Sequence, residues 1–419
     1  MKQKAQHIKL LFRNNSKVAE NYFFMTALQV SVILINLLLY PYLIRTLGKE
    51  SYGTYVFILS NVQLFVLFFA SGFSFPAIKK ISLNADNQQV KNQTISEIFT
   101  AKFLLFVFCA LALVACMFFV PFVRDNLLIY IVMLSMLAIG DMLIPLWYFQ
   151  GMQKMSFIAF VNLGIRLLSI PMIFIFVKSP DNLFDFVAIM SVLPFLGGVF
   201  TYFYLILKEK ISIKFVSIKQ LKPVFKDAIP FYGTSAFEMM RNEGLKIIVG
   251  IFWGMNNVAV YDLAEKIVKI AQIFTSSINT VIFPKAIKDL NVEKIKRIFR
   301  YETIIGLAVT FSVIAFGYWA VLFLGGKELL DAYPLTIILS FTIYFSLIVG
   351  CYVSYIFVPQ NHYYLISKNK LTAMIAFVVM AVAGLIIYKN IMILALAYTL
   401  SYLVEVIQCR YLVKKRRLL

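Results

Sequence analysis

Long apolar segments repeat along the whole chain and constrain its fold more than any other feature. A helix needs about 20 apolar residues to cross the hydrocarbon core of a bilayer, and segments of that length recur about twelve times among the 419 residues. The chain is therefore expected to be an all-α integral membrane protein with about 12 transmembrane helices. The predicted spans are 20–44, 53–77, 98–122, 126–150, 155–177, 185–207, 227–253, 258–283, 301–324, 334–358, 370–388 and 391–413.

The amino-acid composition agrees with a helical membrane protein. Hydrophobic residues make up 61% of the chain and charged residues 14%, whereas a soluble domain carries about 25% charged residues. A transmembrane barrel would show short segments of alternating hydrophobicity instead of long apolar runs. The formal net charge of +20 is open to two interpretations, nucleic-acid binding or membrane topology. Most Lys and Arg residues fall in one alternating set of loops and termini, which favours topology and predicts that both termini are cytoplasmic.

Residue types that commonly bind metals or carry out redox chemistry are sparse. The four cysteines are Cys109, Cys116, Cys351 and Cys409. All four lie in apolar segments, and none has metal-ligand spacing. The only histidines, His7 and His362, lie outside the predicted spans, and the chain has no GxxxxGK[ST] nucleotide-binding loop. We therefore predict no catalytic residue, no metal site and no cofactor.

A weak internal repeat divides the chain near its middle. Seven residues separate Gly48 from Tyr55 in the first half and Gly254 from Tyr261 in the second half. A parallel repeat of two pseudo-symmetric six-helix bundles would enclose a central cavity. Chance placement of glycines at helix ends is the alternative explanation. The predicted divisions are an N-terminal bundle at 1–207, a cytoplasmic connecting loop at 208–226 and a C-terminal bundle at 227–419.

Two consecutive predicted spans carry charges where a membrane helix ordinarily has none. They lie between Ala236 and Pro284. A charge near the bilayer centre costs at least about 2.5 kcal/mol, so such residues usually face a water-filled cavity. We therefore expect these two spans to line a hydrated cavity. The charged residues are Glu238, Arg241, Glu243, Lys246, Asp262, Glu265, Lys266 and Lys269.

The stretch from Pro41 to Tyr55 carries a pattern with a family resemblance. The pattern is Pro-Tyr-Leu-x-Arg-x-Leu-Gly followed by Tyr-Gly-x-Tyr, and a second charged stretch, LKIIVGIFWGMNNVAVYDLAEKIV, follows in the other half. These segments resemble Wzx-type O-antigen and polysaccharide flippases of the multidrug/oligosaccharidyl-lipid/polysaccharide exporter superfamily. The resemblance implies a MATE-like fold that works by alternating access. It also implies transfer of an undecaprenyl-diphosphate-linked oligosaccharide from the cytoplasmic to the periplasmic leaflet of a bacterial inner membrane.

The resemblance also implies that the group to be carried is an anionic diphosphate, which suits cationic side chains. Polar residues from Asp262 to Gln272 recur at helical spacing and share one face. Because the two charged spans run in opposite directions, Lys246 is expected at the depth of Lys266, and Arg241 at that of Lys269. The predicted substrate-binding residues are Arg166, Arg241, Lys246, Lys266, Lys269, Asn61 and Gln272. The predicted ion-coupling or charge-balancing residues are Asp141, Glu238, Glu243, Asp262 and Glu265.

The same charges are open to a structural interpretation, in which they neutralise one another. Glu243 and Lys246 have salt-bridge spacing on a helix, as do Glu238 with Arg241 and Asp262 with Lys266. Arg166 could pair with Asp141 in the same way. Isolated amides such as that of Asn61 often tie membrane helices together, and Glu405 is an equally good candidate for an interhelical partner. We expect Lys102 to extend to the cytoplasmic interface.

Three other functions compete with the flippase interpretation. A drug or cation antiporter of the same superfamily would favour an acidic or aromatic cavity. A membrane-embedded enzyme of polysaccharide assembly would be expected to carry a large external loop or a membrane histidine. A structural scaffold would gain nothing from so many intramembrane charges. Expected partners are the lipid-linked oligosaccharide, the bilayer, and a polysaccharide polymerase with its chain-length regulator, but not nucleic acid. Candidate bend points are Pro41, Pro76, Pro145 and Pro284.

Overall fold

The computed structural model describes residues 35, 37–69, 72–287, 292–360, 362–416 and 418. Every regular element in these ranges is a helix. Nine of the helices described there are long and apolar enough to cross a membrane. They are Leu37–Phe69, Gln88–Phe119, Leu127–Gly151, Met155–Phe176, Pro180–Leu207, Val292–Gly325, Ala332–Phe357, Tyr363–Ile387 and Ile391–Arg416. Two further long helices, α9 (Ile218–Trp253) and α10 (Met255–Ile287), contain the charged stretch.

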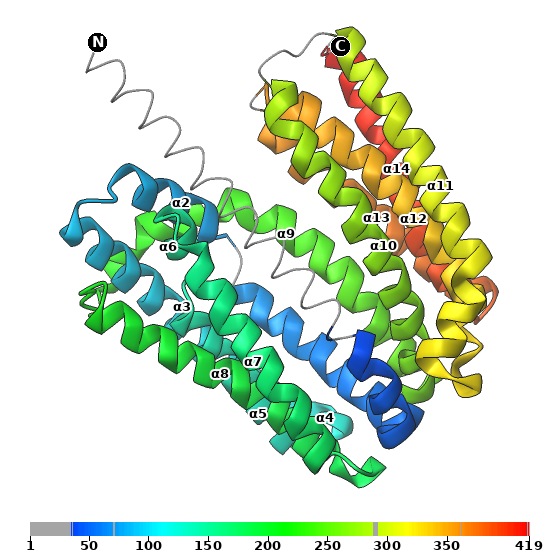
Figure 1. Cartoon of the computed structure of the whole chain (residues 1–419), viewed down its shortest axis with the longest axis horizontal. Coiled ribbons are helices and arrows are strands. Elements are labelled where there is room, and N and C mark those ends of the chain that lie inside the picture. The colour runs from blue at the N-terminus through cyan, green and yellow to red at the C-terminus, as the bar shows by residue number, and fades with distance from the viewer. Residues whose placement is uncertain are drawn as a thin grey trace. The chain divides into compact units, whose positions relative to one another are not determined.

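The chain forms two compact units (Figure 1). Each unit contains residues from both predicted bundles. Unit 1 comprises Met1–Leu39 and Val62–Tyr232, and unit 2 comprises Tyr40–Asn61 and Gly233–Leu419. The predicted division at 208–226 stays a prediction, but the packing groups the segment Tyr40–Asn61 with the C-terminal half. The helix Leu37–Phe69 and helix α9 therefore each contribute residues to both units.

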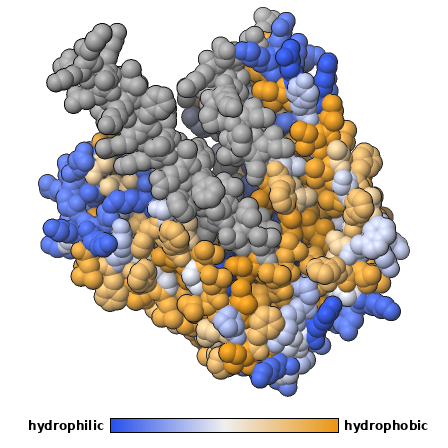
Figure 2. All heavy atoms as spheres, viewed as in Figure 1, coloured by the Kyte–Doolittle hydropathy of each residue, from blue (hydrophilic) through white to orange (hydrophobic). Residues whose placement is uncertain are grey.

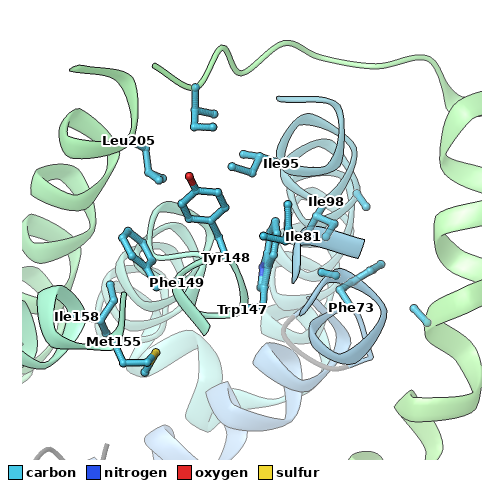
Figure 3. Close-up of a cluster of buried hydrophobic side chains, with 14 of the residues drawn as sticks. Phe73, Ile81, Ile95, Ile98, Trp147, Tyr148, Phe149, Met155, Ile158 and Leu205 are labelled. Carbon is cyan, nitrogen blue, oxygen red and sulfur yellow. The ribbon is translucent and has the colours of Figure 1, made fainter. Parts of the chain in front are cut away.

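Unit 1 consists of both short and long helices. Its elements are α2 (Ser74–Leu83), α3 (Gln88–Phe119), α4 (Pro121–Asp125), α5 (Leu127–Leu143), α6 (Leu146–Gly151), α7 (Met155–Phe176) and α8 (Leu183–Leu207). Helix α8 packs against α5 and α7. A buried cluster joins α2, α3, α6 and the start of α9, and its aromatic centre is Trp147, Tyr148 and Phe149 of α6 (Figure 3).

Unit 2 is centred on α12, which packs against α10, α11 and α14. Its later elements are α11 (Val292–Gly325), α12 (Ala332–Tyr352), a π-helical turn (Val353–Phe357), α13 (Tyr363–Ile387) and α14 (Ile391–Arg416). Helix α13 also packs against α14. Within each unit, apolar side chains cover the middle of the visible face and hydrophilic side chains gather at its ends, as expected for a membrane-spanning protein (Figure 2).

Glycines with left-handed backbone conformations lie at the two positions of the predicted repeat. Gly48 has a φ of +73° and Gly254 a φ of +82°. Such angles are costly for residues that carry a Cβ, which explains why glycine occupies both positions. Tyr55 and Tyr261, seven residues after these glycines, are both buried within unit 2. The repeat therefore has a local structural counterpart as well as a sequence pattern.

Several predicted boundaries differ from the structure. Residues 45–52, predicted to separate the first two spans, are helical within Leu37–Phe69. The span predicted at 53–77 covers parts of two helices, because Gly72 has a φ of +87° and a separate helix, α2, begins at Ser74. Residues 218–226, predicted to belong to a loop, form the start of α9. The apolar side chains of that segment pack on the buried cluster of unit 1, and this burial extends the helix. Residues 20–34 and 36 of the first predicted span lie outside the described ranges.

Candidate functional site

Ten charged side chains pair with one another inside unit 2. Five are basic and five are acidic, so their formal charges balance. The basic residues are Arg241, Lys246, Lys266, Lys269 and Lys370, and the acidic residues are Glu238, Glu243, Asp262, Glu265 and Glu405. They come from α9, α10, α13 and α14. We call this set the unit 2 charge network.

The first part of the network joins α9, α13 and α14. The guanidinium of Arg241 lies 2.6 Å from Glu405 and donates a second hydrogen bond to Ser401 at 3.2 Å. It also lies 4.1 Å from the ring centroid of Tyr402, within the range of a cation–π interaction. Lys370 contacts the other oxygen of Glu405 at 3.3 Å and Glu238 at 3.5 Å. Arg241 and Glu238 thus form their ion pairs with other helices and not with each other.

The second part of the network runs between α9 and α10. Lys246 lies 2.9 Å from Glu243 on its own helix and 3.2 Å from Glu265 on α10. The remaining oxygen of Glu265 lies 2.8 Å from Lys269, one turn further along α10. Each ammonium group therefore has at least one carboxylate partner, which lowers the cost of holding the charge in an apolar unit.

The third part of the network brings aromatic residues to a lysine. Asp262 accepts hydrogen bonds from the hydroxyl of Tyr52 at 2.9 Å and from Lys266 at 2.5 Å. Lys266 also hydrogen-bonds the Tyr52 hydroxyl and lies 4.6 Å from the ring centroid of Tyr40. The segment Tyr40–Asn61 thus supplies an aromatic wall beside the ammonium group of Lys266.

Exposure separates the cations of the network into two classes. The side chains of Arg241 and Lys246 are 1% and 9% exposed, whereas those of Lys266 and Lys269 are 34% and 42% exposed. Both of these more exposed side chains lie on α10 and keep a carboxylate partner. This arrangement can offer positive charge to an anionic ligand at α10 while Arg241 and Lys246 stay paired with carboxylates.

The predicted residues of unit 1 have different neighbours from those expected. Lys102 does not extend to an interface: its side chain is 6% exposed and its ammonium lies 2.6 Å from Asp141. That interaction gives Asp141 a partner on α3, in place of the suggested pairing with Arg166. The reason is that α3 packs against α5, which carries Asp141. Arg166 lies partly buried on α7.

The two predicted amide ligands make hydrogen bonds within unit 2. Gln272 donates to the hydroxyl of Thr342 at 2.9 Å and so ties α10 to α12. Asn61 donates to the carbonyl of Phe57, one turn earlier in its own helix, at 2.8 Å. No group of three or more His, Cys, Asp or Glu side chains in the described part of the chain is arranged to hold a metal ion.

One member of the network, Lys370, and three tyrosines that contact its cations were not among the predicted site residues. Nothing in the local sequence distinguishes these four residues from interfacial residues, so they were not predicted. They are Lys370, Tyr40, Tyr52 and Tyr402. Glu405 was predicted as an interhelical partner, and its contacts with α9 and α13 confirm that role. A single acid inside an otherwise apolar span was the signal that identified it.

The fold and the paired charges inside unit 2 define a helical membrane protein. The sequence matches the family described as "Polysaccharide biosynthesis protein" over residues 18–288, and the chain belongs to this family. Its relatives include proteins named "Putative O-antigen transporter". The one from Escherichia coli (strain K12) is 24% identical over 283 residues, which is 68% of either chain. The one from Shigella dysenteriae is 26% identical over 294 residues, 69% of this chain and 73% of the relative.

Solved structures show the same fold at low sequence identity. The lipid II flippase MurJ in an inward closed conformation aligns with a TM-score of 0.73 and 13% identity, over 94% of this chain and 87% of MurJ. An inward-facing multidrug resistance MATE family transporter of the MOP superfamily aligns with a TM-score of 0.69 and 14% identity, over 93% and 95% of the two chains. The MATE-like fold expected from the sequence is thereby confirmed.

Proposed function

We propose that this protein is a flippase that moves an undecaprenyl-diphosphate-linked oligosaccharide from the cytoplasmic to the periplasmic leaflet of a bacterial inner membrane. Membership of the polysaccharide biosynthesis family is the observation that carries this proposal. The names of the two relatives and the fold shared with a lipid II flippase support it. The substrate is a surface polysaccharide repeat unit such as that of O-antigen.

The physical task of a flippase accounts for the composition of the chain. A polyprenyl tail can remain in lipid, whereas the diphosphate and the glycan must cross the hydrocarbon core in a hydrated, partly cationic cavity. No bond is made or broken, so the protein acts as a transporter and not as an enzyme. The proposed mechanism is alternating access, in which the cavity opens to each side of the membrane in turn.

The network of unit 2 supports specific roles for its cations. Lys266 and Lys269 contact the diphosphate, because their side chains are the most exposed among the cations of the network. Arg241 and Lys246 stay paired with Glu405, Glu243 and Glu265. Within unit 1, Arg166 is proposed as a further substrate-binding residue and Asp141 as a charge-balancing residue. Asn61 and Gln272 are proposed to bind the glycan through their amide groups.

The proposal also includes the orientation of the protein in the membrane and its partners. Both termini face the cytoplasm, because the basic residues gather in the loops on that side. A polysaccharide polymerase and a chain-length regulator act on the product at the periplasmic face. Nucleic acid is not a partner.

A drug or cation antiporter is the second candidate function. The balance of five basic and five acidic side chains in the unit 2 network favours it, because the network has no formal excess of positive charge. The likeness to multidrug MATE transporters agrees with it as well. The exposed positions of Lys266 and Lys269 favour the anionic substrate instead.

Purified protein in proteoliposomes provides the test. A short fluorescent glycan on undecaprenyl diphosphate is placed in the vesicles, and a membrane-impermeant quencher measures its appearance in the outer leaflet. We expect faster flipping than in protein-free vesicles. Folded protein that moves none of several glycans, but exchanges an organic cation for protons, would replace the flippase proposal by the antiporter.

A further inference from the structure

The segment 209–216, which follows α8, lies along a polar stripe on α3. The stripe consists of side chains at every fourth position, which share one helical face. Asn92 accepts a hydrogen bond from the amide of Ser212 at 3.1 Å. The stripe residues are Gln88, Asn92, Ser96 and Thr100.

The next two stripe residues continue the same pattern. Ser96 accepts from the amide of Lys214 at 3.1 Å, and Thr100 accepts from the amide of Val216 at 3.2 Å. Alternate amides of an extended chain point to the same side. The distance between residues two apart on the segment matches the distance between residues four apart on the helix. The stripe therefore recognises the backbone of residues 209–216 and not their side chains.

The beginning of the segment is a strained turn that α3 also holds. Lys210 has a φ of +54°, a left-handed conformation that costs a residue with a Cβ of the order of 1–3 kcal/mol. Gln88 donates to the carbonyls of Glu209 and Lys210, at 3.0 and 2.9 Å. The first residue of the stripe, Gln88, thus stabilises the strained turn at Lys210.

Glu209 fixes the same turn through its side chain, which is 8% exposed. Its carboxylate lies 2.5 Å from the ammonium of Lys154 and accepts a hydrogen bond from Tyr148 at 3.0 Å. Tyr148 belongs to the buried cluster of unit 1 (Figure 3). Gln153, which precedes Lys154, also has a φ of +54°. A left-handed residue thus adjoins each partner of the Lys154–Glu209 ion pair.

The end of the segment is fixed by the start of α9. Gln220 accepts hydrogen bonds from both the amide and the hydroxyl of Ser217 at 3.0 Å, and the bond from the amide is one half of a capping box. Leu221 and Ala228 of α9 then enter the buried cluster of unit 1, as does Ile211 from the segment itself. Both ends of residues 209–216 are therefore attached to unit 1.

We propose that residues 209–216 form a strut that stays docked on α3 throughout the transport cycle, with Glu209 as the positioning residue at its start. The connection between the two halves is then not a flexible tether. Any movement of one unit against the other must then be accommodated by bending within the two helices that contribute residues to both units, Leu37–Phe69 and α9. The docking itself is independent of the proposed flippase function, and only its persistence during transport rests on that function.

Hydrogen exchange of the full-length protein in nanodiscs tests the docking. We expect the amides of Ser212, Lys214 and Val216 to exchange at least about tenfold more slowly than those of Ile213 and Phe215. No acceptor is found for the latter two among the described residues. A combined Asn92→Ala, Ser96→Ala and Thr100→Val variant should lose the alternation. The control Ser312→Ala removes a hydroxyl that bonds only its own helix and should keep it. Equal, fast exchange at all five amides of the wild-type protein would overturn the proposal.

Cross-linking tests whether the strut stays docked during transport. Two cysteine pairs, Asn92→Cys with Ser212→Cys and Ser96→Cys with Lys214→Cys, are made in a background without the four native cysteines. A short bismaleimide then joins each pair. We expect cross-linked protein to flip the fluorescent glycan at the rate of the same variant without cross-linker. Loss of flipping only after cross-linking, in either pair, would show that the segment must release. Absence of flipping by the wild-type protein would refute the flippase function, while the exchange pattern would still decide the docking.

Discussion

The guanidinium of Arg241 on α9 lies 2.6 Å from the carboxylate of Glu405 on α14, and neither side chain is more than 1% exposed. These residues are 164 positions apart in the chain. Lys370 contacts the second oxygen of the same carboxylate. Arg241 therefore ties helices together inside unit 2, whatever else it does during transport. Its deletion would leave a buried acid with one partner fewer, which is ordinarily costly.

We expect Arg241→Ala to lower the free energy of unfolding by about 3 kcal/mol, because removing one partner of a buried ion pair leaves the other charge uncompensated. The combined variant Arg241→Met with Glu405→Leu should recover most of that loss, since Lys370 keeps Glu238 as a partner. Thermal unfolding in detergent measures both. If the double variant is as unstable as Arg241→Ala, the Arg241–Glu405 pair is not the source of the effect.

The helices could be predicted from the sequence, but the ion pairs between helices could not. Apolar runs placed about half of the predicted spans within a few residues of an observed helix at both ends. Other helices, such as Gln88–Phe119 and Val292–Gly325, begin several residues earlier, in polar sequence that an apolar run does not include. Helical spacing also identified the pairs Glu243–Lys246 and Asp262–Lys266. It could not identify the partner of Arg241, because that depends on how α9 and α14 are rotated about their axes.

Other long-range contacts of the network and of unit 1 were not predicted either, because they also depend on the rotation of each helix about its axis. Tyr52 reaches Asp262 across 210 positions, and Lys102 reaches Asp141 across 39. Each contact needs two helices to be packed together, and one helix turns by 100° per residue, so an error of one residue moves a side chain to another face. A single sequence contains no measurement of that rotation.

Lys266→Gln and Lys269→Gln should affect transport more than stability. Asp262 keeps its hydrogen bond from Tyr52 in the first variant, and Glu265 keeps Lys246 in the second. Because both side chains are at least a third exposed, we expect stability changes below about 1 kcal/mol. If they contact the diphosphate, each substitution should slow flipping about tenfold, the equivalent of about 1.4 kcal/mol.

Initial flipping rates in proteoliposomes measure this effect, and Lys389→Gln is the matched control. Lys389 is exposed in the turn between α13 and α14 and belongs to no ion pair in the described network. Its replacement should leave the rate unchanged. Folded Lys266→Gln and Lys269→Gln proteins that flip as fast as the control would remove both lysines from the proposed diphosphate site.

The Lys154–Glu209 pair predicts a pH dependence of the strut. Burial tends to raise the pKa of Glu209, but hydrogen bonds from Lys154, Tyr148 and Tyr204 outweigh it and lower the pKa below its ordinary value of about 4.5. A carboxylate whose pKa falls on folding contributes stability above its unfolded-state pKa. That contribution is lost as the pH falls below about 4.5 through the lowered pKa.

Limited proteolysis at residues 209–216 measures the consequence. The segment should resist an acid-tolerant protease equally between pH 8 and pH 5 and become more susceptible at lower pH. Glu209→Gln should be more susceptible than the wild-type protein between pH 8 and pH 5. The two proteins should converge at lower pH, where the wild-type carboxyl is protonated. Glu50→Gln, which replaces an exposed acid of unit 2, should behave like the wild-type protein. A wild-type profile shared by Glu209→Gln would exclude Glu209 as the positioning residue.

The same substitution, glycine to alanine, should have opposite effects at two positions of unit 2. Gly53 lies inside the helix Leu37–Phe69, where a Cβ would collide with the backbone carbonyl of Met255 at the start of α10. Gly244 lies inside α9, where a Cβ would meet nothing within 4 Å. Alanine stabilises an unobstructed helix by about 0.8–1.0 kcal/mol relative to glycine, whereas overpacking a close contact costs about 1–3 kcal/mol.

We therefore expect Gly244→Ala to raise the unfolding temperature and Gly53→Ala to lower it. Backbone cannot move aside as a flexible side chain can, so the helix carrying Gly53 must shift away from α10. The adjacent residue, Tyr52, would then lose its hydrogen bond to Asp262, and the aromatic wall would move away from Lys266. Gly53→Ala should consequently slow flipping as well, while Gly244→Ala should not. Stabilisation by both substitutions would mean that the segment Tyr40–Asn61 does not pack against α10 in this way.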